Sequence, residues 1–230
     1  MFNASPAVGL LFHVDGATSS FLGTCFAFRR ATHFITAAHC TGSLPPKQLA
    51  IGLPLIRRDG AFAVASVDRH HEADLAVLRL AASGSDAPGL DPFPDFATGF
   101  TMGDQFYAFG FPQDVFGERA TQPTARLFRG HFQRYMRHQS RHGFHYNAGE
   151  MSIGAPAGLS GGPVFRLGDG GLVAGLVTEN RESTTFLDSV EEIQTDGKTQ
   201  KKQYVEVINY GVSLLLDSLG EWLATQVPKL

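Results

Sequence analysis

Residues 156–165 read Pro-Ala-Gly-Leu-Ser-Gly-Gly-Pro-Val-Phe and hold three glycines within five positions. Glycine adopts backbone conformations that are closed to other residues and lets another group approach the main chain closely. Pro163 then stiffens the exit into an apolar run. The stretch therefore predicts a tight turn that can present Ser160 as an exposed nucleophile with backbone N–H groups beside it. The same Gly-x-Ser-Gly-Gly pattern also occurs in plain turns between strands.

A serine hydroxyl is a weak nucleophile at neutral pH, so the nucleophile interpretation requires a base and a group that orients the base. His39 is the candidate base, because an apolar strand-like run ends just before it in two alanines that allow close packing around an imidazole. Asp74 is the candidate orienting carboxylate, because it enters the alternating segment 73–80, where a carboxylate can be buried.

Other residues compete for these two roles. Four further histidines lie near the same segments: His13, His33, His70 and His71. None of them is followed by a comparable packed turn, so we interpret them as ordinary surface or core residues. Asp68 lies between a polar Ser66 and a run of basic residues, which indicates a solvated loop. Asp74 is therefore the preferred carboxylate.

The remaining pattern favours strands. Residues 8–64 contain short alternating runs broken by glycine and proline, as in an all-β barrel or sandwich. Residues 74–80 would close this unit, and 83–99, rich in glycine, proline and aspartate, form the expected linker. A length of 230 residues with 43% hydrophobic content allows one large domain or two small lobes. The net charge of −3 argues against a general nucleic-acid-binding chain.

The second half repeats the strand pattern and ends in an amphipathic segment. Strands are expected near 105–109, 126–134, 143–149, 163–165, 172–179 and 202–210. Residues 212–225 carry apolar side chains at helical spacing: Leu215, Leu216, Leu219, Trp222 and Leu223. This spacing predicts a C-terminal helix over about 212–225.

Together these segments resemble the chymotrypsin-like (trypsin-like) serine peptidases. The chain has that family's order of histidine, aspartate and serine, in Thr-Ala-Ala-His-Cys at 36–40, Asp-Leu-Ala-Val-Leu at 74–78 and Gly-Leu-Ser-Gly-Gly-Pro at 158–163. Segments 107–112 and 205–214 are similar to the bacterial branch that includes the high-temperature-requirement and glutamyl endopeptidases. The resemblance covers most of the chain.

The resemblance implies two six-stranded antiparallel β-barrels, here residues 1–90 and 91–230, with the C-terminal helix at the end of the second. It assigns Ser160 as nucleophile, His39 as general base and Asp74 as its orienter. The first barrel supplies His39 and Asp74, and the second supplies Ser160. The N–H groups of Gly158 and Ser160 are then expected to form the oxyanion hole.

The activity implied is that of a serine endopeptidase acting on polypeptides through an acyl-enzyme, and the alternative is a catalytically silent domain that binds peptides or proteins. By resemblance, the substrate pocket is formed by the following residues: Gly154, Ala155, Val177, Thr178, Glu179 and Asn180. We expect Glu179 to point sideways along the cleft, which leaves no carboxylate at the pocket base. A pocket of small and apolar groups predicts cleavage after small or medium apolar residues.

Two charged stretches have two interpretations each. Residues 126–145 carry many arginines and histidines without an acidic residue, which indicates a solvated hairpin or, alternatively, a surface for an anionic partner or a nucleic acid. Residues 179–196 are acidic and are expected to form a flexible loop near the cleft, which could attract basic substrates.

Cys25 and Cys40 match, by resemblance, the pair that staples the catalytic histidine loop in secreted relatives, and in a cytoplasm they would stay reduced. The apolar run 8–12 is too short for a signal peptide core or a membrane span, so we expect a cytoplasmic location and no membrane association. No metal-ligand spacing and no phosphate-binding loop is present, and we expect no cofactor.

Leu159 departs from the pattern of the digestive and clotting relatives. There an aspartate precedes the nucleophile and pairs with a new amino terminus created by cleavage. Leucine cannot form that ion pair. We therefore expect the turn at Gly158 to be ordered either by packing of Leu159 on apolar neighbours or by a regulatory protein partner.

Overall fold

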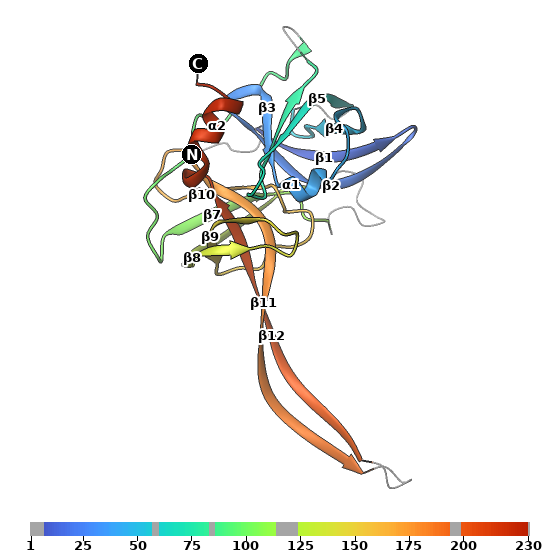
Figure 1. The fold of residues 1–230 in the computed structure, drawn as a ribbon, viewed down its shortest axis with the longest axis vertical. Helices are drawn as coiled ribbons and strands as arrows, with labels where there is room; N and C mark the ends of the chain where they lie inside the picture. The colour runs from blue at the N-terminus through green and yellow to red at the C-terminus, as the bar shows by residue number, and fades with distance from the viewer. Residues whose placement is uncertain (1–6, 57–59, 83–85, 114–123, 194–198, 230) are drawn as a thin grey trace.

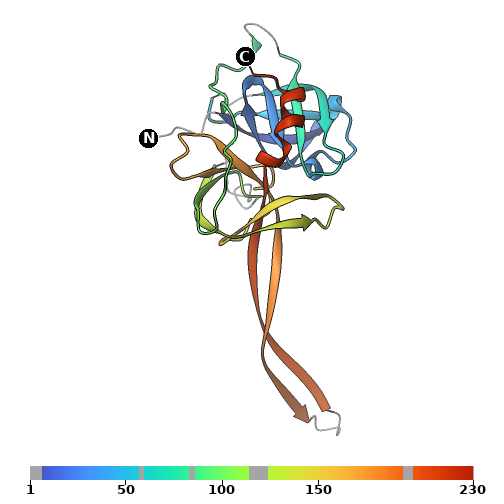
Figure 2. The same ribbon diagram turned by 60° about the vertical axis from the view of Figure 1, so that its left-hand side comes forward.

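The computed structural model describes residues 7–56, 60–82, 86–113, 124–193 and 199–229. These residues form two closed barrels of six antiparallel strands each, and a long two-stranded hairpin projects from the second barrel (Figure 1). A short helix near the C-terminus lies against the first barrel (Figure 2). The predicted all-β double barrel with a C-terminal helix is confirmed.

The first barrel contains the strands β1 (Val8–Asp15), β2 (Thr18–Phe28), β3 (Arg30–Thr36), β4 (Leu49–Gly52), β5 (Ala61–Arg69) and β6 (Ala76–Leu80). They join in the order β1-β2-β3-β6-β5-β4, and pairing of β1 with β4 closes the ring. Both faces of the central strands are buried: Phe34 pairs with Leu78 on one face, Phe26 pairs with Ile35 on the other, and all four side chains are fully buried. Burying each such side chain stabilises the fold by roughly 1.5–3 kcal/mol.

Two short elements lie between β3 and β4: the one-turn helix α1 (Ala38–Thr41) and the 3-10 turn η2 (Pro46–Gln48). Helix α1 follows β3 directly, so it begins at the rim of the first barrel. This places His39 where the alternating run ends, as the sequence pattern indicated.

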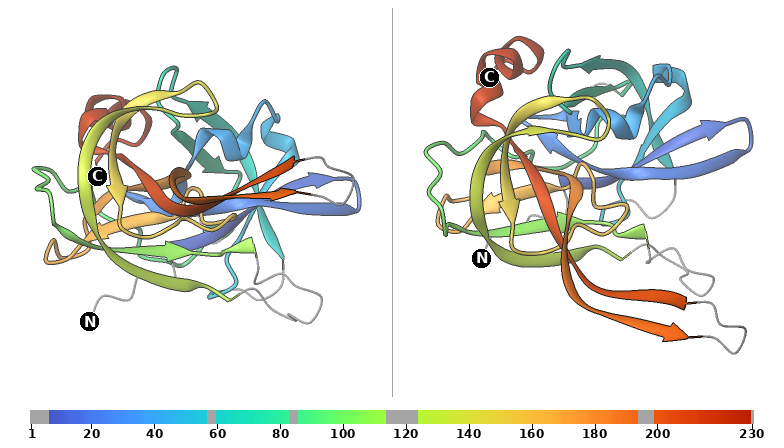
Figure 3. Two further views of the ribbon diagram at one scale, coloured as in Figure 1. Left: turned by 90° about the horizontal axis from the view of Figure 1, so that it is seen from below. Right: turned by 60° about the horizontal axis from the view of Figure 1, so that its bottom comes forward.

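The second barrel contains the strands β7 (Gln105–Gly110), β8 (Arg126–Gln139), β9 (His145–Met151), β10 (Pro163–Arg166), β11 (Val173–Ile193) and β12 (Thr199–Leu215). Their order is β10-β11-β12-β9-β8-β7, closed by β10 on β7. Phe106, Phe132 and Val164 fill its interior. Figure 3 shows β8 and β9, the predicted hairpin of the basic stretch, beside the root of β11 and β12.

The segment between the barrels is also packed. Phe93 is buried and makes edge-to-face ring contacts with Phe26 of the first barrel at 5.8 Å and with Phe165 of the second at 4.9 Å. Such aromatic pairs add stability beyond the area they bury. The two barrels therefore share one apolar core, which holds their facing sides in a fixed relation.

The acidic segment 179–196 is not a loop near the site, as we had expected. Up to Ile193 it belongs to β11, which pairs with β12 from Gly175↔Leu215 out to Ile193↔Thr199, and residues 194–196 lie outside the described residues. The reason is local: the central part, Ser-Thr-Thr-Phe-Leu at 183–187, favours strands and faces Val-Glu-Val-Ile at 205–208. We had predicted a loop from the acidic residues of this segment, although the residues between them favour a strand.

The C-terminal helix is shorter than predicted. Helix α2 spans Gly220–Gln226 after the 3-10 turn η5 (Asp217–Leu219), whereas 212–215 continue β12. Residues 211–216 are all buried, and Val212 and Leu214 pair with β9, so this apolar run is a strand that is buried on both faces. Leu223 is buried, and Arg29 of the first barrel donates to the Val227 carbonyl at 2.9 Å. No helix among the described residues is long and apolar enough to cross a membrane.

Candidate active site

His39 and Asp74 form a direct pair. His39 Nδ1 donates to Asp74 Oδ2 at 2.7 Å, and the backbone N–H of His39 donates to Asp74 Oδ1 at 2.9 Å. The Asp74 side chain is only 1% exposed. Because both carboxylate oxygens bind the same residue, the imidazole has one orientation, with Nδ1 toward Asp74 and Nε2 directed away from it.

The loop before β6 positions Asp74. Nδ1 of His70 accepts hydrogen bonds from the backbone N–H of Glu72 and of Ala73, at 3.1 and 2.9 Å. The backbone N–H of His70 donates to the Leu75 carbonyl at 2.9 Å, which closes the loop. His70 therefore shapes the loop that carries Asp74.

Asp68, the competing carboxylate, lies in strand β5 opposite Val77 rather than in a loop, and it is exposed. Asp68 thus has the solvated position that we expected, although in a regular strand. Its backbone is fixed by the barrel and gives it no contact with His39 among the described residues.

The turn that carries Ser160 requires its glycines. Gly158 and Gly161 have φ values of +89° and +84°, a region that L side chains rarely adopt. A Cβ on Gly161 would lie 2.1 Å from the Thr24 carbonyl oxygen, and one on Gly158 would lie 2.7 Å from the Phe111 carbonyl oxygen. Both positions therefore exclude any larger residue.

Leu159 is fully buried in the second barrel, in the same cluster as Phe106 and Val164. Of the two ways in which we expected the turn to be ordered, the structure shows the apolar packing. The turn is also tied to the first barrel, because the Thr24 N–H donates to the Ser160 carbonyl at 2.9 Å.

Two carbonyl groups that precede Ser160 are hydrogen-bonded within the protein. The Ala157 oxygen accepts from the Gln113 N–H at 2.6 Å, and the Gly158 oxygen accepts from Thr24 Oγ1 at 2.8 Å. No described residue accepts a hydrogen bond from the N–H of Gly158 or of Ser160. These two donors are therefore available for an oxyanion.

The Ser160 hydroxyl does not contact His39. Oγ donates to the Thr178 carbonyl at 2.8 Å, while His39 Nε2 lies 3.6 Å from Cys40 Sγ. Burial lowers the pKa of His39, but the hydrogen bonds that the imidazole makes to Asp74 and Cys40, together with the charges of those groups, outweigh burial and raise the pKa to about 10. In this arrangement His39 holds its proton at neutral pH, and Ser160 is turned aside from it.

Gly154, Ala155 and Asn180, all expected in the substrate pocket, do meet. Asn180 Nδ2 donates to the Ala155 carbonyl at 2.7 Å, and Asn180 Oδ1 accepts from the Ala155 N–H at 2.5 Å. A Cβ on Gly154 would lie 3.5 Å from the Asn209 carbonyl oxygen. The two strands that form the projecting hairpin thus begin beside these residues.

The other three expected pocket residues are differently placed. Val177 is fully buried in the barrel core. Thr178 Oγ1 donates to the Val212 carbonyl at 3.0 Å and accepts from Tyr146 at 3.0 Å, so only its carbonyl reaches Ser160. The pairing register shifts between Val177 and Glu179, and a bulge of this kind redirects the side chains around it.

Glu179 does not point along the cleft, as we had expected, but is buried against the turn between β8 and β9. It accepts from His138 Nε2 at 2.5 Å and from the Arg141 backbone N–H at 3.4 Å. Both partners border the turn between β8 and β9, so Glu179 fixes that turn. A buried carboxylate needs such partners, and the sequence did not show that β8 would supply them.

His142, which the sequence analysis did not single out, lies directly over the candidate base. Its ring stacks on that of His39 with centroids 4.6 Å apart and planes 8° apart. Burial and the charge of His39 lower the pKa of His142, so it stays neutral beside the imidazolium. In the sequence, only the basic composition of residues 126–145 pointed to His142, because its contact with His39 forms between the two barrels.

Cys25 and Cys40 are both free and buried. Burial, reinforced by the neighbouring Cys40, holds the pKa of Cys25 well above its usual value. The part of the chain that the structure describes contains no group of three or more His, Cys, Asp or Glu side chains arranged to hold a metal ion.

A model of the trypsin-like peptidase domain matches residues 23–175, more than half of the chain and the region that contains all three candidate residues. The chain belongs to the trypsin-like peptidase family. A search among curated proteins gave no match for this trypsin-like peptidase.

Solved structures share the fold. The Rv3671c protease from M. tuberculosis in its active form is 17% identical with a TM-score of 0.63, over 96% of this chain and 81% of that one. The MamO protease domain from Magnetospirillum magneticum is 17% identical with a TM-score of 0.62, over 96% and 97%. The HtrA-type protease AlgW with tripeptide is 18% identical with a TM-score of 0.63, over 97% and 61%.

These likenesses establish the double-barrel fold of this trypsin-like peptidase and place it among HtrA-type and chymotrypsin-like neighbours, as the sequence resemblance predicted. An inactive form of Rv3671c also matches, with a TM-score of 0.61. Since active and inactive forms align almost equally well, the fold alone does not decide whether a member cleaves peptides.

Proposed function

We propose that this chain is a serine endopeptidase that hydrolyses peptide bonds through an acyl-enzyme, with Ser160 as nucleophile, His39 as general base and Asp74 as its orienter. The observation that carries the proposal is the buried His39–Asp74 pair. Its Nδ1–Oδ2 distance is 2.7 Å, and both carboxylate oxygens accept hydrogen bonds from His39. An orienting carboxylate of this kind fixes the tautomer in which Nε2 can accept a proton.

The reaction begins with rotation of the Ser160 side chain. In the resting arrangement Oγ donates to the Thr178 carbonyl, so the hydroxyl must leave that acceptor to donate to His39 Nε2. Neutral His39 then takes the proton as Oγ attacks the substrate carbonyl, and it returns the proton to the leaving amine. In deacylation a water molecule is the nucleophile: His39 takes its proton as it attacks the acyl carbonyl, and returns the proton to Ser160 Oγ as the acyl-enzyme bond breaks.

The turn around Ser160 supplies the oxyanion donors. The negative oxygen of the tetrahedral intermediate binds the N–H groups of Gly158 and Ser160, which have no acceptor among the described residues. Because neighbouring carbonyls are held by Gln113 and Thr24, the donors are oriented before substrate arrives. Removing one such donor in related chemistry costs about 10²–10³ in rate.

The substrate binds in extended form along β11. Past Pro163↔Leu176, the last pair with β10 at that end, the edge of β11 at 178–180 is open to an added strand. The side chain before the scissile bond would meet Gly154, Ala155 and the Asn180 amide, a small, uncharged set. We therefore propose cleavage after small or medium apolar residues. A peptide-library profile dominated by Arg, Lys or Glu would overturn this preference.

A second function has a specific observation in its favour. Ser160 Oγ is bound to Thr178, and His39 is held in its charged form, which is the arrangement of a silent, peptide-binding domain. Binding along the edge of β11 would need no chemistry at Ser160.

A fluorophosphonate probe separates these two functions, because only an activated serine is labelled. We expect wild-type protein to be labelled and Ser160→Ala to remain unlabelled. Ser152→Ala is the matched control, since Ser152 is a serine of the same barrel away from His39, and it should be labelled normally. Absence of labelling in wild type, under conditions where a control peptidase reacts, overturns the endopeptidase proposal.

A further inference from the structure

The two strands of the projecting hairpin lack neighbours for most of their length. We name residues 182–193 of β11 and 199–209 of β12 the arm. Among the described residues, these parts of β11 and β12 pair only with each other, because pairing of β12 with β9 ends at Gly211↔Met151. Figures 1 and 2 show the arm running away from both barrels. At 3.3 Å per residue it reaches roughly 40 Å.

Both faces of the arm carry exposed apolar side chains. Side chains alternate along β12, so Val205 and Val207 share one face with Phe186, the partner of Val205, and Tyr204 and Ile208 lie on the other. Phe186 is 57% exposed and Tyr204 is 53% exposed. A bare two-stranded ribbon is marginally stable in water. Large apolar side chains that are exposed together in one segment usually mark an interaction site.

The charge of the arm limits what can cover it. By sequence the arm carries five carboxylates (Glu182, Asp188, Glu191, Glu192 and Glu206) and two lysines (Lys201 and Lys202), so it is negative overall. A β-ribbon can enter a nucleic-acid groove, but an acidic one is repelled by phosphates. Anionic lipid surfaces are disfavoured for the same reason. The complementary surface is therefore a basic one with some apolar area.

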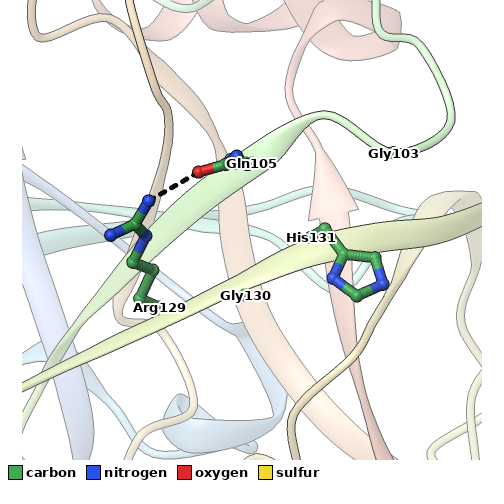
Figure 4. Close-up of a pocket in the computed structure, with 5 residues that line it drawn as sticks. All are labelled: Gly103, Gln105, Arg129, Gly130 and His131. Atoms are coloured by element: carbon green, nitrogen blue, oxygen red, sulfur yellow. Dashed lines mark hydrogen bonds between the residues drawn. The ribbon is translucent and has the colours of Figure 1, made fainter.

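The chain itself presents such a surface on β8, which we name the β8 face: Leu127, Arg129 and His131. These alternate residues lie on one side of the strand, and Leu127 is 62% exposed. Beside them is an open depression of about 460 Å³, lined by Gly103, Gln105, Arg129, Gly130 and His131 (Figure 4).

No carboxylate lines this depression. Arg129 donates to Gln105 at 2.7 Å, as Figure 4 shows, and a guanidinium has further donors for a carboxylate. The neighbouring Asp104 is held by Arg166 at 3.3 Å and does not neutralise the β8 face. The basic stretch that the sequence analysis singled out thus leaves a positive, partly apolar surface.

We propose that the arm of one molecule docks on the β8 face of a second copy of the chain, which returns the same contact. Figures 1 and 2 show the arm running away from the barrel that contains β8, so the arm of a second molecule is needed to cover the β8 face. A reciprocal contact of this kind has two-fold symmetry, the commonest form of protein dimer.

The β8 face limits the area of the contact. Leu127 to His131 extend roughly 13 Å along the strand, so one side of each contact offers about 130 Å² to a ribbon about 10 Å wide. Two reciprocal contacts, counted on both partners, then bury about 500 Å², the size of a weak association. The arm begins beside Asn180 and Asn209, so a docked arm also steadies the residues around Gly154. That last consequence rests on the proposed function, whereas the dimer does not.

Charge reversal tests the pairing. One variant carries Asp188→Arg and Glu206→Arg on the arm, and the other carries Arg129→Glu and His131→Glu on the β8 face. Each variant alone sets like charges against each other in both contacts, and we expect its self-association to weaken at least about tenfold. Mixed in equal amounts, the two variants have complementary charges in both contacts, so the dimer should return. Sedimentation velocity over micromolar to submillimolar concentrations measures the outcome.

Controls keep the result interpretable. Glu221→Arg reverses an exposed charge on helix α2, away from both surfaces, and should dimerise like wild type. Circular dichroism checks that every variant is folded. A monomeric wild type, or charge-reversed variants that each still dimerise, would overturn the proposal, as would a mixture that stays monomeric. All these readouts are independent of Ser160, so a loss of peptidase activity leaves them unchanged.

Discussion

The two barrels differ in whether their candidate catalytic residues already have the arrangement that the reaction needs. In the first barrel, His39 and Asp74 are hydrogen-bonded at 2.7 Å, and the carboxylate is buried. In the second, Ser160 has the glycine turn and the N–H donors of a nucleophile, yet Oγ is bound to the Thr178 carbonyl. The difference teaches that folding alone assembles the contact made within one barrel. The contact between the barrels depends on a side-chain rotation.

The largest effect should come from removing the reacting groups. We expect Ser160→Ala and His39→Ala each to lower kcat by about 10⁶, and the double variant to be little worse, because the residues act as a unit. Asp74→Asn should keep the fold and cost about 10⁴ through the wrong imidazole tautomer. Asp68→Asn, a matched carboxylate on β5, should be nearly silent. Normal cleavage by Asp74→Asn together with loss in Asp68→Asn would reverse the assignment.

A second prediction disturbs only the glycine turn that carries Ser160 in the second barrel. Gly161→Ala places a Cβ 2.1 Å from the Thr24 carbonyl oxygen at a φ of +84°. We expect the free energy of unfolding to fall by more than about 3 kcal/mol, the range of severe backbone strain and overpacking. Urea denaturation measures the loss. Gly168→Ala, also at positive φ but with open space around it, should cost far less, and equal losses would show that crowding is not the cause.

A third prediction uses pH to separate activity from stability. The pKa of His39 is raised in the folded state, so activity, which needs neutral His39, should rise with pH to an acid limb above pH 7. Stability should move the other way. A raised folded-state pKa contributes stability that is complete below the unfolded value of 6.5 and is lost as pH rises toward about 10.

Cys40→Ala sharpens this third prediction. It removes one of the hydrogen bonds that raise the pKa of His39, so the acid limb of kcat/KM should shift to lower pH. Cys25→Ala is the matched control, because Cys25 is also buried but does not bond to His39. If both substitutions leave the pH profile unchanged, Cys40 has no part in holding the proton.

The sequence predicted the fold and the candidate residues because both depend on short-range patterns. Alternation marked most strands, and the glycines around Ser160 marked a turn that crowding and positive φ indeed impose. The arm was missed because charge was weighed above strand propensity. The C-terminal helix was extended too far because the strand residues 212–215 are buried on both faces, and such an apolar run has no two-residue period that distinguishes it from a helix.

Contacts between distant segments could not be predicted from the sequence. Nothing local shows that Glu179 would be buried against His138, or that β8 and β9 would carry a second imidazole to the site. These placements depend on how the second barrel closes and how it packs on the first. The roles assigned to His39, Asp74 and Ser160 stay predictions until cleavage is measured.

The smallest effect we predict concerns the contact that joins the two barrels over the base. His142 covers one face of His39 with planes only 8° apart, and we predict that a substrate extended along residues 178–180 competes for that space. His142→Ala should therefore raise kcat/KM by about two- to tenfold, mainly by lowering KM, because the substrate no longer has to displace or order the His142 imidazole when it binds. The matched control is His145→Ala on the same hairpin, whose backbone N–H still donates to Glu72. A lower kcat with unchanged KM in His142→Ala alone would instead make His142 a positioning residue that holds the His39 ring in place.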